Sequence, residues 1–343
     1  MKIVLKPALM ISTILIALIL LALFFPTWTP RIKGENSISV LEHVELNGTK
    51  QEIMIRGNDR NNPVILNVHG GPGASEIPFA KKMQDLLETK FTIVNYDQRA
   101  SGKSYHFSED YSNLSSDLLV KDLLAVTDYI TERLEKEKII LIGHSYGTYL
   151  ATQAASRAPE KYEAYIGIGQ MGDTVESEID ALHYVLEQAG QEGNAEDAAQ
   201  LQQLQEAIEN GGALTPRGYV NKYGGASRLT KIPDATLVNL TFTSEYNLLD
   251  AIRYNKGMNQ SQGILIEEVF KHPLPTLVNK LDLPVYFVMG DYDFMTSSQA
   301  ARHYFDSIEA EHKEFLPYAE SAHYPQYEEK ERFVRWMSDT FLD

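Results

Sequence analysis

The sequence of 343 residues contains no cysteine. Disulfide bonds, thiolate nucleophiles and cysteine-based metal sites are therefore excluded. Export from the cell is still compatible with this composition, because an exported protein can fold without disulfides. Any nucleophile that the chain uses in catalysis has to come from another residue type.

Positive charge is also scarce. The chain has 31 lysine and arginine residues against 47 aspartate and glutamate residues, which gives a formal net charge of −16. A surface with this charge argues against nucleic acid or an anionic membrane surface as a ligand. Hydrophobic residues make up 43% of the chain, which is ample for a buried core. The length suits one large domain with an insertion, or two domains.

The chain has one long apolar run, at its N-terminus, from Ala8 to Phe25. As a helix this run is about 27 Å long, close to the thickness of the bilayer core. We therefore expect residues 1–33 to form a membrane anchor and linker. The main domain is expected outside the cytoplasm, because Lys2 and Lys6 precede the run. The alternative is a cleaved signal peptide and a secreted protein.

The segment from Ile139 to Leu150 predicts a strand, a tight turn and a helix. It begins Ile-Ile-Leu-Ile, which is typical of a short buried strand, and continues Gly-His-Ser-Tyr-Gly. In a G-x-S-x-G turn the serine has a strained backbone conformation at the end of a strand, and its hydroxyl is exposed. Glycines two residues to either side let neighbouring backbone pass closely. Ser145 is therefore the candidate nucleophile.

A second glycine-rich turn follows the predicted strand 63–68. Its sequence, from His69 to Gly73, is His-Gly-Gly-Pro-Gly. Acyl transfer needs two backbone N–H donors aimed at the developing oxyanion, and glycine lets the main chain come close. We expect the N–H of Gly71 to be one donor. The N–H of Tyr146, directly after the candidate nucleophile, is expected to be the other.

A third loop, from Asp97 to Ser104, ends in Gly-Lys-Ser. This ending is shared with the phosphate-binding P-loop, but that motif requires a glycine five residues before Gly102. The chain has Asp97 at that position. Nucleotide binding is therefore not predicted.

The three loops with their strands, strand-HGGPG, strand-DQRASGKS and strand-GHSYG, resemble the α/β-hydrolase family in their order and spacing. More specifically, they resemble its proline iminopeptidase-like branch of serine peptidases, over residues 40–342. The resemblance implies a mostly parallel eight-stranded sheet with helices on both faces and a helical cap. The core would comprise residues 34–169 and 284–343, and the cap residues 170–283. No metal or organic cofactor is implied.

The same resemblance selects the partners of the nucleophile. A Gly-x-x-Asp turn after the strand 284–289 corresponds to the acid position of the family, which selects Asp293 over Asp291. His323 lies between the last predicted strand and the closing helix, where the family has its base. The order Ser145, Asp293, His323 matches the order of nucleophile, acid and base in the superfamily.

The segment 170–283 lacks the rhythm of strands and is predicted to be largely helical. In aminopeptidases of the resembled branch, carboxylates of the cap hold the free α-amine of the substrate. The candidates here are Glu176, Glu178 and Glu245, and Glu245 is preferred because aromatic residues flank it. The alternative for each is a solvated surface glutamate.

These observations predict an aminopeptidase that releases N-terminal residues from short peptides through an acyl-enzyme. Two alternatives stay open. One is a carboxylesterase or lipase-like hydrolase that acts on small acyl esters with the same residues. The other is a non-catalytic, membrane-tethered binding protein on the same fold. The expected partners are a small-molecule or short-peptide substrate and, through the N-terminal helix, a membrane, with no nucleic acid and no metal.

Overall fold

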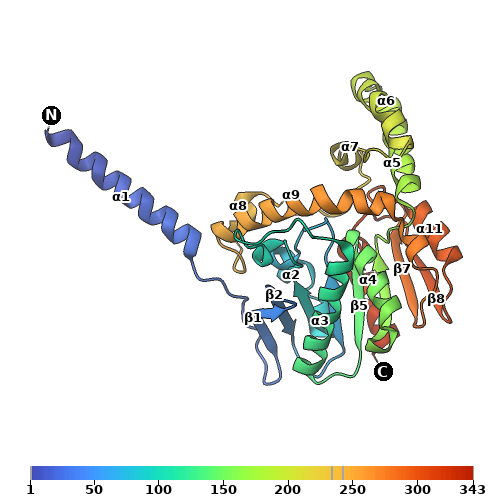
Figure 1. Ribbon diagram of the computed structural model, residues 1–343, viewed down its shortest axis with the longest axis horizontal. Coiled ribbons are helices and arrows are strands. Elements are labelled where there is room, and N and C mark those ends of the chain that lie inside the picture. The colour runs from blue at the N-terminus through green and yellow to red at the C-terminus, as the bar shows by residue number, and fades with distance from the viewer. Residues whose placement is uncertain (1, 233–234, 242, 343) are drawn as a thin grey trace.

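The computed structural model describes residues 2–232, 235–241 and 243–342. Its centre is an eight-stranded sheet with the order β1-β2-β4-β3-β5-β6-β7-β8 (Figure 1). The pairs β1–β2 and β2–β4 are antiparallel, and the remaining pairs are parallel. The predicted mostly parallel eight-stranded sheet is confirmed. The strands are β1 (Ile38–Leu46), β2 (Thr49–Gly57), β3 (Val64–Val68), β4 (Thr92–Tyr96), β5 (Ile139–His144), β6 (Tyr162–Ile168), β7 (Val285–Gly290) and β8 (Lys313–Tyr318).

The helices of the described residues fall into three groups. One helix, α1 (Lys2–Phe24), precedes the sheet. The second group connects or follows the strands: α2 (Ile77–Met83), α3 (Ser116–Leu134), α4 (Tyr146–Arg157), α11 (Ser298–Ser307), α12 (Pro325–Glu328) and α13 (Lys330–Phe341). The third group lies between β6 and β7: α5 (Thr174–Gln191), α6 (Ala195–Glu209), α7 (Arg217–Lys222), α8 (Leu237–Thr241), α9 (Leu248–Lys271) and α10 (Leu274–Leu277). Short 3-10 turns occupy Leu87–Thr89, Gly102–Ser104 and Pro159–Lys161.

The central strands are apolar on both faces. In β3 and β5, Leu66 and Leu141 belong to one hydrophobic cluster, which also contains residues of α3 and α4. Their neighbours Ile65 and Ile140 belong to a second cluster, which α13 closes with Phe333. Successive side chains of a strand point to opposite faces, so strands that are apolar throughout have to be covered on both sides. The continuous apolar sequence of β5 thus places it in the middle of the sheet.

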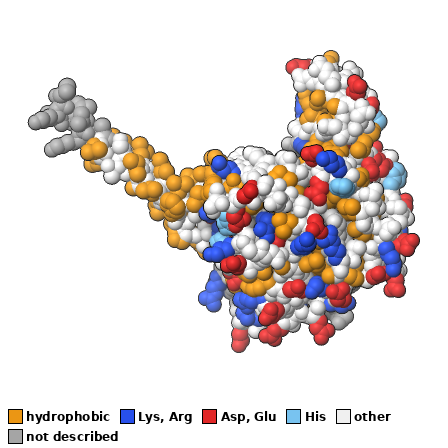
Figure 2. All heavy atoms as spheres, in the orientation of Figure 1, with side chains coloured by type: hydrophobic (Ala, Val, Ile, Leu, Met, Phe, Trp, Pro, Cys, Tyr) orange, Lys and Arg blue, Asp and Glu red, His pale blue; other side chains and the backbone are white. Residues whose placement is uncertain are grey.

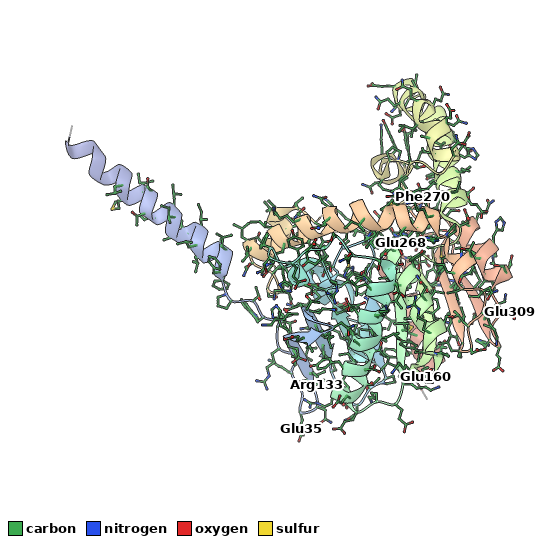
Figure 3. The ribbon with its side chains drawn as sticks, in the orientation of Figure 1. Glu35, Arg133, Glu160, Glu268, Phe270 and Glu309 are labelled. Carbon is green, nitrogen blue, oxygen red and sulfur yellow. The ribbon has the colours of Figure 1, made fainter. Side chains whose placement is uncertain are left out.

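The helices between β6 and β7 cover one end of the sheet. Helix α9 crosses over the strands, while α5, α6 and α7 project beyond it (Figure 1). Near the end of α9, Glu268 (labelled in Figure 3) accepts hydrogen bonds from the N–H and hydroxyl of Ser116, the first residue of α3. Further along, a Cβ added to Gly257 would lie 2.4 Å from the carbonyl oxygen of Ala100. These contacts fix α9 directly against the loops at the carboxyl ends of the strands.

The segment that follows α1 packs against the body of the protein. The N–H of Trp28 donates to the carbonyl oxygen of Ser244 over 3.0 Å. The ammonium of Lys103 donates to the hydroxyl of Thr27 over 2.8 Å. These bonds connect the segment after α1 to the loop after β4 and to the segment before α9.

The prediction of an N-terminal membrane anchor is wrong. Within the described ranges of the chain, no helix is both long enough and apolar enough to cross a membrane. A membrane span needs about 20 consecutive apolar residues. Apolar side chains line the described part of the projecting helix α1 (Figure 2). The membrane partner and the membrane-anchored localisation inferred from residues 1–33 are withdrawn with it.

A close backbone approach next to β5 yields a test of the fold. A Cβ added to Gly147 would lie 1.9 Å from the carbonyl oxygen of Val68 at the end of β3. Because rigid backbone forms this contact, we expect Gly147→Ala to lower the free energy of unfolding by about 3 kcal/mol. Urea denaturation of the two proteins measures the difference.

The matched control is Gly263→Ala within α9, where an added Cβ meets no atom within 4 Å. This substitution should raise the free energy of unfolding by about 0.5–1 kcal/mol, because alanine restricts the unfolded chain more than glycine does. Equal stability of the two variants would contradict the close approach at Gly147.

Candidate active site

Ser145 lies in the tight turn between β5 and α4. Its backbone angles, φ 54° and ψ −127°, lie in a region that residues other than glycine rarely adopt. The turn is held because the N–H of Ser145 donates to the carbonyl oxygen of Ile168 over 3.0 Å. The flanking glycines are required, since a Cβ on Gly143 would lie 2.8 Å from the Cα of Thr148. The local geometry is that of the G-x-S-x-G turn that the sequence predicts.

The glycine-rich loop after β3 runs beside this turn. A Cβ on Gly70 would lie 2.8 Å from the Cβ of Ser145, so only glycine allows the approach. Gly71 has a positive φ of 117° and borders a cavity together with Ser145 and Tyr146. Tyr146 is the first residue of α4, where a helix leaves its N–H groups without intrahelical partners. Both expected amide donors therefore come from segments next to the serine.

Buried polar residues support this loop from behind. The Nε2 of His69 accepts from the N–H of Gln98 over 3.2 Å, and Nδ1 lies 3.0 Å from the carbonyl oxygen of Gly70. Burial lowers the pKa of His69 to about 4, so the ring is neutral and can donate at Nδ1. Asp97 accepts from the hydroxyl of Ser75, which links the loop after β4 to the end of the glycine-rich loop. His69 therefore holds the loop in place through both of its ring nitrogens.

His323 and Asp293 form a buried pair. The Nδ1 of His323 lies 2.8 Å from Oδ2 of Asp293, and the two side chains are at most 2% exposed. The other oxygen of Asp293 accepts from the N–H groups of Met295 and Thr296 over 2.9 and 3.0 Å. A Cβ on Gly169 would lie 2.8 Å from Cε1 of His323, so the ring is confined. Burial lowers the pKa of His323 below its ordinary value, although the charge of Asp293 opposes this effect.

A cavity of about 790 Å³ brings these groups together. Ser145, His323 and Gly71 line it from the core, and residues of the segment between β6 and β7, such as Arg217 and Met258, line it from the other side. A smaller cavity of about 70 Å³ also reaches Ser145 and is lined by Tyr146 and Glu178. The site is thus a pocket whose floor carries a hydroxyl, an imidazole and backbone amides.

Residues 63–330 of the chain match the family described as the alpha/beta hydrolase fold. The chain belongs to this family. A probable aminopeptidase of Bacillus subtilis (strain 168), YbaC, is 28% identical over 314 residues, which cover 90% of this chain and 98% of that protein. The proline iminopeptidase of Saccharolobus solfataricus is 28% identical over 137 residues, or 39% of this chain and 38% of that protein.

Among solved structures, the proline iminopeptidase of Mycobacterium smegmatis superposes with a TM-score of 0.64. The match covers 88% of this hydrolase and 97% of that chain at 16% sequence identity, which shows a common fold. The resemblance to the proline iminopeptidase-like branch of the α/β-hydrolases is confirmed.

The three cap glutamates of this hydrolase lie in different surroundings. Glu178 lines the smaller cavity at Ser145, but its carboxylate is occupied by the guanidinium of Arg217 and by the N–H of Thr215, the latter over 2.7 Å. Glu176 pairs with His303. Glu245 is 3% exposed and accepts from the hydroxyl of Ser244. Of the three, only Glu178 lines either of the two cavities at Ser145.

The structure adds two titratable residues, His144 and Glu76, that the sequence analysis did not select. Nδ1 of His144 lies 3.0 Å from a carboxylate oxygen of Glu76, and Nε2 lies 3.1 Å from the backbone carbonyl oxygen of His323. The rings of His144 and His323 are 4.8 Å apart. The position of Glu76 just after the glycine-rich loop, and of His144 just before Ser145, was the only signal in the sequence.

A metal site requires several ligand side chains to lie close together. In the part of the chain that the structure describes, no group of three or more His, Asp or Glu side chains is placed to hold a metal ion.

The pair of Asp293 and His323 yields a prediction with a defined pH dependence. We expect Asp293→Asn to lower kcat by about 10⁴-fold, because the amide no longer fixes the imidazole in the required orientation and tautomer. The charge of Asp293 raises the pKa of His323, so its loss lowers that pKa. A base has to be neutral to accept a proton, so the acid limb of kcat/KM should move to lower pH in the variant.

Steady-state kinetics from pH 4 to 9, with the substrate that wild type cleaves, measure both effects. Asp291→Asn is the control, because Asp291 is exposed in the same turn. It should keep kcat within about twofold. An Asp293→Asn enzyme with the rate and pH profile of wild type would contradict the pairing.

Proposed function

We propose that this α/β-hydrolase is a serine hydrolase that cleaves N-terminal residues from short peptides through an acyl-enzyme. Ser145 is the nucleophile, His323 the general base and acid, and Asp293 the residue that orients His323. The observation that carries the proposal is the buried 2.8 Å contact of His323 with Asp293, in a cavity that His323 shares with the strained Ser145 turn.

The proposed reaction follows from these positions. The Oγ of Ser145 attacks the substrate carbonyl carbon while His323 takes its proton. The amides of Gly71 and Tyr146 stabilise the negative charge that develops on the carbonyl oxygen, at little reorganisation cost because these N–H groups are already oriented. The tetrahedral intermediate then expels the amine, which receives the proton from His323. Water repeats the sequence on the acyl-enzyme, releases the acid and restores Ser145.

A peptide substrate is favoured by the relative from Bacillus subtilis, which is named a probable aminopeptidase and matches almost end to end. A second candidate is a carboxylesterase. It is favoured by the apolar side chains of Met258, Ile266 and Met295, which line the large cavity and suit an uncharged acyl group. Both functions use the same mechanism, so the substrate decides between them.

The role of Ser145 is tested by Ser145→Ala. We expect kcat/KM to fall by at least about 10⁴-fold with the thermal unfolding temperature nearly unchanged, because only the attacking oxygen is lost. Wild type should also react with a fluorophosphonate probe, and the variant should not. An unreactive serine in folded wild type would favour the non-catalytic binding protein instead.

The leaving group is tested with a matched panel. It contains aminoacyl amides and short peptides, the N-acetylated form of each, and short acyl esters. An aminopeptidase should prefer the free α-amine by at least about 100-fold in kcat/KM, since the charged group has to be paired in the cavity. Efficient ester hydrolysis without dependence on the amine would establish the carboxylesterase and remove the aminopeptidase proposal.

A further inference from the structure

Glu76 lies at the end of the glycine-rich loop, directly before α2. Its Oε2 accepts hydrogen bonds from the hydroxyl of Tyr327 and the amide of Asn67, each over 3.0 Å. Its Oε1 has one such contact, to the ring of His144. A carboxylate oxygen has two acceptor sites, so Oε1 has room for a further donor.

The neighbouring imidazole keeps this carboxylate ionised. Burial alone would raise the pKa of Glu76, but its hydrogen bond and charge interaction with His144 hold it below the ordinary value. Burial alone would lower the pKa of His144, and the same pair raises it. Glu76 is therefore a fixed negative charge at neutral pH.

The carboxylate also reaches the substrate cavity. The side chain of Glu76 is 17% exposed, and it lines the cavity of about 790 Å³ with Ser145 and His323. Among the described residues that line this cavity, Glu76 is the only aspartate or glutamate. The rings of Tyr254 and Tyr324 line it as well, and aromatic faces attract ammonium groups.

The position suits an N-terminal amine. The α-amine of a peptide is separated from the first carbonyl carbon by a single carbon atom, so its acceptor has to lie near the nucleophile. Glu76 contacts the residue directly before Ser145. Glu178, the candidate cap glutamate that lines the smaller cavity at Ser145, has both oxygens engaged by Arg217.

We propose that Glu76, supplied by the core and not by the cap, receives the α-ammonium group of the substrate and thereby confers specificity for a free N-terminus. This inference rests on the proposed aminopeptidase function. It concerns binding, however, and a binding measurement can test it separately from peptide cleavage.

The kinetic test compares the ratio of kcat/KM for an aminoacyl amide to that for its N-acetylated form. Glu76→Gln keeps the size of the side chain and removes its charge. We expect this ratio to fall by about 10- to 100-fold, because a charge-assisted hydrogen bond to the ammonium is lost. A purely structural role would lower both rate constants by the same factor and leave the ratio unchanged, which would overturn the proposal.

Two further variants sharpen the comparison. Glu76→Asp keeps the charge but moves it one methylene further from the cavity, so its ratio of kcat/KM values should lie between those of wild type and Glu76→Gln. It replaces Glu76→Gln in the test if the glutamine variant does not fold. Glu176→Gln is the matched control, because Glu176 pairs with His303 and does not line the cavity. A loss of amine preference in Glu176→Gln but not in the Glu76 variants would assign the amine to the cap.

The binding test uses the full chain with Ser145→Ala and does not need turnover. Calorimetry compares alanyl-alaninamide with its N-acetylated form, with and without Glu76→Gln. We expect the free dipeptide amide to bind at least tenfold more tightly, and Glu76→Gln to abolish that difference. Such binding without peptide hydrolysis by wild type would refute the aminopeptidase function and retain the amine site. Equal binding of both ligands would refute the amine site.

Discussion

The candidate active site depends on the close approach of two backbone segments at one edge of the sheet. β3 and β5 are parallel neighbours, so the glycine-rich loop and the nucleophile turn leave the sheet side by side. At Gly147 the backbone of the turn approaches the carbonyl oxygen of Val68, and at Gly70 the loop approaches Ser145. A side chain at either glycine would separate the amide donors from the hydroxyl. The register of two buried strands therefore sets the distance between Ser145 and the proposed oxyanion site.

The sequence was informative wherever function requires a local backbone conformation. Apolar strands such as β5 can be recognised because burial on both faces leaves a continuous hydrophobic run. The turn at Ser145 can be recognised because its glycines are steric requirements. The N-terminal prediction failed for a related reason: an apolar run such as that from Ala8 to Phe25 reports composition only. A membrane span requires a helix that is both long enough and apolar enough, and none of the helices in the described residues fulfils this requirement.

Contacts between distant side chains could not be predicted in the same way. Glu76 and His144 are 68 residues apart in the sequence and meet only because β3 and β5 are neighbours. Glu178 was selected as a free cap carboxylate, but Arg217, 39 residues later, neutralises it. Neither pairing produces a periodic pattern or a characteristic spacing in the sequence. Such pairs depend on side-chain directions and on the path of the connecting loops, which a single sequence does not specify.

These two pairs also explain the electrostatic setting of His323. The charges of His144 and Arg217 add to burial in lowering the pKa of His323, and Asp293 raises it. A general base has to be neutral before the attack and cationic during it. Neither a pKa that is only lowered nor one that is only raised would allow both states. Arg217 is paired with the carboxylate of Glu178, and the ring of His144 contacts the carboxylate of Glu76, which limits the repulsion that a protonated His323 experiences. In the proposed mechanism, the site thus keeps His323 neutral at rest, and Asp293 would stabilise the imidazolium that forms when Ser145 attacks.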